Sequence, residues 1–188
     1  MSSPTAAAQG ARRKDWSDWD PSRLARERRE VAAFAPDLNF LEPGSPLAPH
    51  AGWEGRLPLW PFDRPQPEGL EVLVASPLEI RVLYSAAHPA VSPRVIPLSP
   101  RPRPMEISVT QWHILPDGAL CLVQSEGMWV PEASTTELLL KAAGWRIEYA
   151  LMEVGAMPAM SIRGIASDAS LDPLISKTAS IKNGVGYA

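Results

Sequence analysis

The residue best suited to covalent chemistry in this 188-residue chain is its single cysteine, Cys121. A Pro-Asp-Gly turn signal at residues 116–118 precedes it, and the segment 119–123 that leaves the turn is apolar. If that segment is extended, the side chain of Cys121 points away from those of Leu120 and Leu122. Its neighbours can then anchor the backbone while the thiol stays accessible. Because a thiolate is a strong nucleophile, an accessible cysteine at this position could carry out covalent chemistry.

A lone cysteine in an alternating apolar run is also typical of an inert core position, and this alternative stays open for Cys121. One cysteine excludes an internal disulfide framework and a cysteine-cluster zinc site. The three histidines, His50, His88 and His113, show no ligand spacing, so we expect no structural metal. The chain has no Gly-rich phosphate loop.

Two amphipathic helices are predicted around this segment. The clearer one opens at residues 134–137, where Ser-Thr-Thr-Glu fits a capping box. Its apolar residues then follow on one stripe suited to lying across a sheet, namely Leu138, Ala142, Trp145, Tyr149 and Met152. The other helix starts at Asp20-Pro21 and ends before Pro36. Its interleaved arginines and glutamates indicate a solvated face, with a basic docking surface as the alternative.

Several short strands are predicted between the helices. Residues 70–75 and 78–84 are expected to form adjacent antiparallel strands, because the second run alternates apolar and charged side chains. A third strand is expected near 94–98 and a weaker one around 106–110. The proline-rich stretch 36–67 is expected to be irregular and held to the core by three aromatic rings, Trp53, Trp60 and Phe62.

The composition indicates one folded domain. With 45% apolar residues the chain can bury a core, and a net charge of −3 argues against a general nucleic-acid partner. The longest apolar runs are too short to span a membrane, and the N-terminus has no apolar signal core. We therefore expect a soluble cytoplasmic protein without a membrane partner. Residues 1–19 are expected to be a mobile arm, 20–155 the domain, and 156–188 a flexible or loosely docked tail.

Several linked features surround Cys121. Pro116 and Gly118 precede it, Trp-Val-Pro follows at residues 129–131, and the predicted capped helix comes next. Together they resemble the ubiquitin-conjugating enzymes, in which the catalytic cysteine follows a His-Pro-Asn triplet and a turn with glycine three residues before it. In that family a Trp-x-Pro and a crossover helix come afterwards. The segment HPAVSPRV from His88 is similar to the family's Tyr-Pro-x-x-Pro-Pro segment, and the resemblance covers about residues 21–155.

The resemblance implies an α/β (α+β) fold with an N-terminal helix, a four-stranded antiparallel meander, a cysteine loop and a crossover helix. The chain departs from the family in three ways. Gln-Trp-His at residues 111–113 replaces His-Pro-Asn, which places His113 where the family has its oxyanion-assisting asparagine. Trp53 and Trp60 lie in an unusually proline-rich region, and no clear counterpart of the C-terminal helices follows Gly155. With these departures the chain resembles the divergent bacterial relatives of the family, which occur in ubiquitin-like conjugation systems associated with antiphage defence.

The resemblance implies that Cys121 receives the C-terminal carboxyl of a ubiquitin-like protein from an activating enzyme. Cys121 would hold that carboxyl as a thioester and pass it to an amine of a target protein. The activating enzyme would consume the ATP, so this chain would need no cofactor. His113, eight residues before Cys121 and across the turn, could fold back towards the thiol. It could donate to an oxyanion, favour the thiolate, accept a proton or only bond the turn.

Two other functions stay open. In the first, a non-catalytic module of the same fold docks a ubiquitin-like protein or an activating enzyme, and Cys121 is incidental. In the second, the chain is a thiol redox or peroxide sensor. Because a single cysteine provides no resolving thiol, such a sensor would need an external one.

Overall fold

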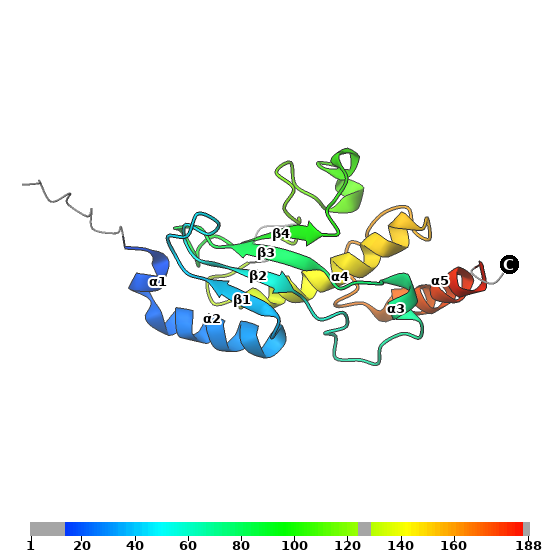
Figure 1. Ribbon diagram of the computed structural model, residues 1–188, viewed down its shortest axis with the longest axis horizontal. Coiled ribbons are helices and arrows are strands. Elements are labelled where there is room, and N and C mark those ends of the chain that lie inside the picture. Colours follow the sequence, from blue (N-terminus) through cyan, green and yellow to red (C-terminus); the bar gives the residue numbers. More distant parts are fainter. Residues whose placement is uncertain (1–13, 124–128, 186–188) are drawn as a thin grey trace, which may run out of the picture.

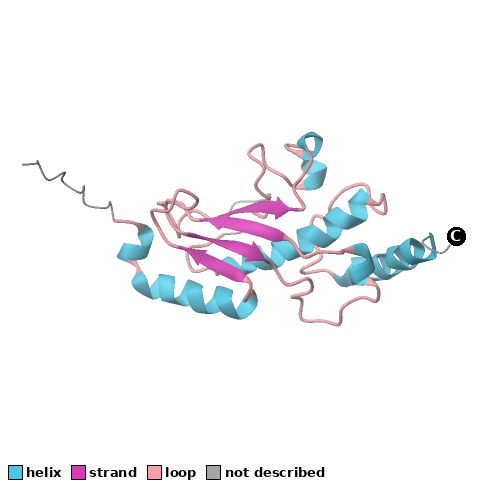
Figure 2. Ribbon diagram, in the orientation of Figure 1, coloured by secondary structure: helices cyan, strands magenta, loops and turns pink. Residues whose placement is uncertain are grey.

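A four-stranded antiparallel sheet and a long helix lie at the centre of the computed structural model, which describes residues 14–123 and 129–185 (Figure 1). Short 3-10 turns and four other helices surround them (Figure 2). The strands are β1 (Leu38–Leu41), β2 (Gly52–Arg56), β3 (Glu79–Leu83) and β4 (Arg94–Ser99). The α-helices are α1 (Trp16–Trp19), α2 (Pro21–Phe34), α3 (Leu70–Leu73), α4 (Thr135–Glu153) and α5 (Asp172–Val185). The predicted mixed α+β class is confirmed.

The strands form a meander in the order β1-β2-β3-β4, as expected. Trp53 on β2 pairs with Val82 on β3, and Val82 pairs with Val95 on β4. All three side chains are buried, so this row of cross-strand neighbours faces the core. The predicted strands over residues 78–84 and 94–98 are confirmed as β3 and β4.

The predicted strand over residues 70–75 is wrong, because these residues begin with the short helix α3. Gly69 adopts a φ of +78° and turns the chain ahead of the helix, in a conformation that favours glycine. Leu70 and Leu73 are one helical turn apart, and both are buried. Helix α3 packs against α5, which is distant in the sequence. A local apolar run cannot reveal that contact.

Two further expectations about the sheet are wrong. Both β1 and β2 lie in the proline-rich stretch 36–67, and Trp53 lies on a strand instead of an irregular loop. Residues 106–110 form no strand and follow a 3-10 turn, η1 (Pro104–Glu106). The carboxylate of Glu106 is buried and accepts a bond of 2.8 Å from the hydroxyl of Tyr149. That buried bond fixes the segment outside the sheet.

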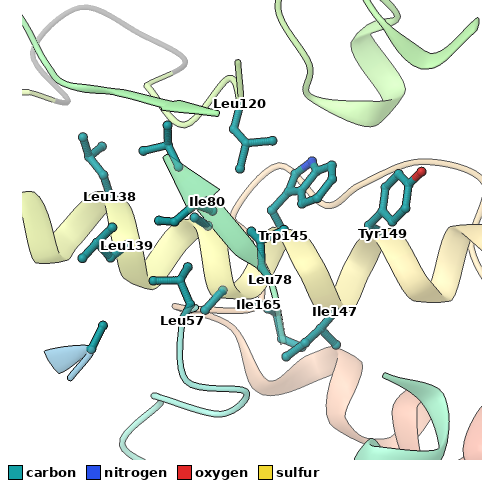
Figure 3. Close-up of a cluster of buried hydrophobic side chains, with 14 of the residues drawn as sticks. Leu57, Leu78, Ile80, Leu120, Leu138, Leu139, Trp145, Ile147, Tyr149 and Ile165 are labelled. Carbon is teal, nitrogen blue, oxygen red and sulfur yellow. The ribbon is translucent and has the colours of Figure 1, made fainter. Parts of the chain in front are cut away.

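Helix α4 crosses one face of the sheet and supplies much of the core (Figures 1 and 3). Its predicted capping box is confirmed: Ser134 Oγ accepts from the amide of Thr136 at 3.2 Å, and Glu137 Oε1 accepts from the amide of Ser134 at 3.3 Å. The whole predicted stripe is buried, namely Leu138, Ala142, Trp145, Tyr149 and Met152. No helix among the described residues combines the length and apolar character needed to cross a bilayer.

The ordered structure begins earlier than expected. Helix α2 starts where predicted, and Asp20 Oδ1 accepts from the amide of Arg23 at 2.9 Å. The end of the expected mobile arm, however, forms helix α1. Its Trp16 is 4% exposed and donates through Nε1 to the carbonyl of His50 at 2.8 Å. The prediction of a mobile arm over residues 1–19 is therefore wrong for residues 14–19, and residues 1–13 lie outside the described residues.

A buried ionic cluster attaches α2 to the sheet and to α4. The Glu27 carboxylate lies 3.2 Å from the Arg23 guanidinium and 3.8 Å from His88 Nε2. It also accepts a 3.5 Å bond from the hydroxyl of Tyr84, which bonds Thr135 Oγ1. Burial disfavours the ionised carboxyl, but bonds from His88 and Thr135 and the charge of Arg23 outweigh it and lower the pKa of Glu27. The cluster therefore holds a carboxylate in the core.

The C-terminal region is packed, although we expected residues 156–188 to be flexible or loosely docked. Ile165, Ile175 and Ala179 are buried in the same core cluster as α4. Arg64 Nε donates to Asp172 at 2.8 Å at the start of α5. Helix α5 also follows Gly155, where no C-terminal helix was expected. The expectation is corrected as far as Val185, and residues 186–188 lie outside the described part.

Substitution of Ile175 by alanine should destabilise the whole domain. Ile175 is fully buried, so its loss removes apolar contacts and leaves a cavity, which costs about 2–5 kcal/mol. Ile181→Ala on the same helix is the control, because Ile181 is 59% exposed and should cost less than about 0.5 kcal/mol. Urea unfolding followed by tryptophan fluorescence measures both. Equal effects of the two substitutions would show that α5 is not part of the core.

Substitution of Glu27 by glutamine should destabilise the domain by about 3 kcal/mol at pH 7, because it leaves the buried Arg23 without its counter-charge. The folded state lowers the pKa of Glu27 below its ordinary value of 4.5. The contribution of the Glu27 charge to stability is therefore fully present above pH 4.5 and is lost as the pH falls through the folded-state pKa. The difference between wild type and Glu27→Gln should therefore shrink below pH 4.5. Urea titrations at pH 7, 4.5 and 3.5 measure this difference. A gap that widens on acidification would contradict the assignment.

Candidate active site

A short hairpin brings Cys121 next to His113. Ile114 and Leu120 form an antiparallel bridge, and the amide of Cys121 donates to the carbonyl of His113 at 2.8 Å. Gly118, at the tip of the hairpin, has a φ of +82°, a left-handed conformation that residues with a side chain rarely adopt. The chain therefore folds back across the turn and places the two candidate residues opposite each other.

The hairpin is fixed to the sheet through the residue before the cysteine. The amide of Leu120 donates to the carbonyl of Val95 on β4 at 2.8 Å, and the side chain of Leu120 is buried. Leu120 belongs to the same core cluster as Ile80 and Trp145 (Figure 3). Cys121 itself is half-buried. The expected anchoring by Leu120 is thus observed, and the cysteine is not sealed in the core.

Asp117 serves the turn, as its position predicted. Its Oδ1 accepts from the amide of Ala119 at 3.0 Å, and its carboxylate pairs with Arg94 on β4. The first contact lies within the turn, and the second holds the tip of the hairpin against the sheet. The conformation of the turn is therefore fixed by side chains as well as by Gly118.

His113 and Cys121 line one cavity, whose other walls come from α4 and from residues 160–166. The volume of the cavity is about 60 Å³. Ligand pockets usually occupy roughly 300–1,000 Å³, so this cavity suits a reacting group and not a whole metabolite.

A second, wider hollow is also lined by Cys121. It is lined by Ser108, Thr110 and Val123, together with His113 and Cys121. Cys121 also lines a third cavity, together with Val95 on β4 and Leu138 on α4.

Helix α4 holds the hairpin through two side chains one turn apart. The ammonium of Lys141 donates to the carbonyl of Leu122 at 3.3 Å. The indole of Trp145 donates to the carbonyl of Trp112 at 2.9 Å. One bond therefore lies next to Cys121 and the other next to His113. Both side chains also line the narrow cavity.

Glu148, one turn further along α4, closes the cavity with a C-terminal segment. Its buried carboxylate accepts from the amide and the hydroxyl of Ser161 at 2.6 and 2.8 Å, and from the amide of Ile165 at 2.8 Å. The amide of Met160 donates to the carbonyl of Gln111 at 3.0 Å. We call residues 160–166 the strap, because they join α4 to the segment before His113.

Sequence reasoning missed Lys141, Glu148 and the strap. One signal was present: Glu148 is a charged residue within the apolar stripe of a helix, where burial requires bonding partners. The identity of those partners had no local signal, because the strap follows the helix through an irregular segment.

Two residues from the motifs that resemble the ubiquitin-conjugating enzymes, Trp129 and His88, lie away from the cavities beside Cys121. Trp129 is half-buried, and its indole donates to the carbonyl of Pro89 at 2.8 Å. That bond joins the loop before α4 to the loop after β3, so Trp129 buttresses these loops, and it lines none of the three cavities beside Cys121. His88 is buried beside Glu27, in agreement with a structural role.

Within residues 14–123 and 129–185, no three histidine, cysteine or carboxylate side chains gather into a group that could hold a metal ion. No protein-family model matches the chain, and no curated protein does so either. Any assignment of function to this chain therefore depends on the geometry around Cys121 and on its local sequence motifs.

Proposed function

We propose that this chain is a conjugating enzyme for a ubiquitin-like protein. Cys121 accepts the C-terminal carboxyl of the modifier from the thioester of an activating enzyme and passes it to an amine of a target protein. The observation that carries the proposal is that a half-buried cysteine lies opposite His113 and that both residues line one cavity. Because the activating enzyme consumes the ATP, the chain itself needs no cofactor.

The order and arrangement of elements support this proposal. A helix precedes a four-stranded antiparallel meander, a cysteine-bearing hairpin follows the last strand, and a long helix then crosses the sheet. The ubiquitin-conjugating enzymes, which the sequence resembles around Cys121, have the same order. A modifier-conjugation role in a bacterial antiphage defence system is the setting that we propose from that resemblance.

The chemistry required is within reach of the residues present. Thiol–thioester exchange is nearly balanced in free energy, so Cys121 can be loaded from another thioester without a further energy source. The carbonyl oxygen gains negative charge when an amine attacks, and a nearby donor stabilises it. The imidazole of His113 lines the same cavity as Cys121 and can provide that donor or accept the amine proton.

The backbone at His113 is consistent with its replacing the family's asparagine. His113 has a φ of 49° and a ψ of 47°, in the left-handed region. Among residues other than glycine, asparagine, aspartate and histidine are the most enriched in that region. The position therefore restricts which polar side chains can stand opposite Cys121.

Thioester formation is the first test. The chain is incubated with a candidate activating enzyme, its ubiquitin-like protein and ATP, and then run on a non-reducing gel. An adduct that disappears on adding a reductant is expected for wild type and should be absent for Cys121→Ala. Cys121→Ser should give a more stable oxygen ester or no transfer.

The Cys121→Ala variant, tested for biological activity, separates the carrier from the docking module and the redox sensor. If Cys121→Ala retains full biological activity, the chain is a docking module in which the cysteine is incidental. If activity depends on oxidant and needs no activating enzyme, Cys121 is a redox site. Either result would refute the proposed carrier.

Loss of the His113 side chain should slow transfer without unfolding the protein. His113→Gly is the suitable variant because glycine adopts the positive φ without strain, whereas alanine does not. Discharge of the Cys121 thioester to free lysine should fall by about 100-fold, with loading less affected. His113→Asn should retain most of the discharge rate. Single-turnover discharge assays and melting temperatures measure both effects. Wild-type discharge in His113→Gly would show that the side chain only supports the turn.

A further inference from the structure

Lys141 is the one lysine of this chain that lines the cavity beside Cys121. The chain has 4 lysines among its 18 basic residues, namely Lys14, Lys141, Lys177 and Lys182, and all lie in the described part. Lys14 lies over the ring of Trp19, while Lys177 and Lys182 are on α5. The other 14 basic residues are arginines, whose guanidinium stays protonated and is not an acyl acceptor.

The Lys141 amine is within reach of an acyl group on Cys121. Its Nζ lies 3.3 Å from the carbonyl oxygen of Leu122, the residue after the cysteine. Consecutive Cα atoms are 3.8 Å apart, so Nζ is within about 10 Å of the Cα of Cys121. The four-carbon stem of lysine is flexible, and Lys141 and the cysteine line the same cavity. Rotation of the Lys141 side chain away from Leu122 is therefore the movement that transfer to its amine requires.

We propose that Lys141 is an internal acceptor of the acyl group carried by Cys121, a modification site that ends the cycle of the enzyme. This inference rests on the proposed function. The neutral amine of Lys141 attacks the thioester carbonyl, the C–N bond forms and the C–S bond breaks. The resting ammonium of Lys141 must first release one proton to solvent water, and the sulfur of Cys121 then leaves as a thiol that takes the second proton given up by the attacking amine. The products are an amide on Lys141 and a free Cys121.

The product would have properties different from the thioester. An amide does not exchange with thiols, so the modifier stays attached when a reductant is added. Its linkage would occupy the narrow cavity and displace the bond from Lys141 to Leu122. Because the cavity volume is only about 60 Å³, a filled cavity has no room for an incoming acceptor amine. Transfer to Lys141 thus removes the enzyme from further use when no target is present.

A small thioester tests this step without any partner protein. The full chain is incubated with the S-phenyl thioester of acetyl-glycylglycine, which mimics the end of a modifier, and is followed by intact and peptide mass spectrometry. The acyl mass should appear first on Cys121 as a thioester and then on Lys141 as an amide. Because both groups share a cavity, Lys141 should react at least about 100-fold faster than Lys177 and Lys182, which serve as internal controls.

Two variants decide the result. In Cys121→Ala the acylation of Lys141 should fall to the rate of the control lysines. In Lys141→Arg, which keeps the cation and a donor to Leu122, the thioester on Cys121 should persist. The inference is overturned if Lys141 is acylated equally fast in Cys121→Ala, if the loaded thioester decays without an amide on Lys141, or if Cys121 never loads. A reductant-sensitive, ATP-dependent adduct would in each case still support the proposed function, so the two failures are distinguishable.

Discussion

The bond from the amide of Cys121 to the carbonyl of His113 is the contact on which the site depends. Its length of 2.8 Å fixes the register of a hairpin in which these two residues stand opposite each other. Side chains alternate along an extended segment, so a slip of one residue would turn the thiol towards the core and Leu120 towards solvent. Burial of Leu120 and its bond to Val95 oppose such a slip.

Support for this hairpin comes from two sides with different physical character. On the sheet side the contacts are apolar burial, one backbone bond to β4 and the ion pair of Asp117 with Arg94. On the helix side they are bonds from Lys141 and Trp145 to backbone carbonyls of the hairpin and of the segment before it. Apolar contacts tolerate small displacements, whereas hydrogen bonds are directional. The combination holds the backbone in place and leaves a cavity at the junction.

The sequence allowed the central helix and the cysteine–histidine pair to be predicted because their signals are local. The Ser134 capping box and the apolar stripe define α4, and a Pro-Asp-Gly turn brings residues eight apart together. The strand predicted over residues 70–75 failed for the opposite reason: the run is apolar in either geometry, and its partner α5 is remote in the chain. The strap was missed because one carboxylate, Glu148, organises it across an irregular segment.

The strap has a consequence for how the protein is made. Residues 160–166 are synthesised after the hairpin that carries the thiol. A nascent polypeptide therefore exposes Cys121 before the wall held by Glu148 exists. The narrow cavity is assembled only after the strap has left the ribosome, so the reactive centre is completed later than the hairpin that carries the thiol.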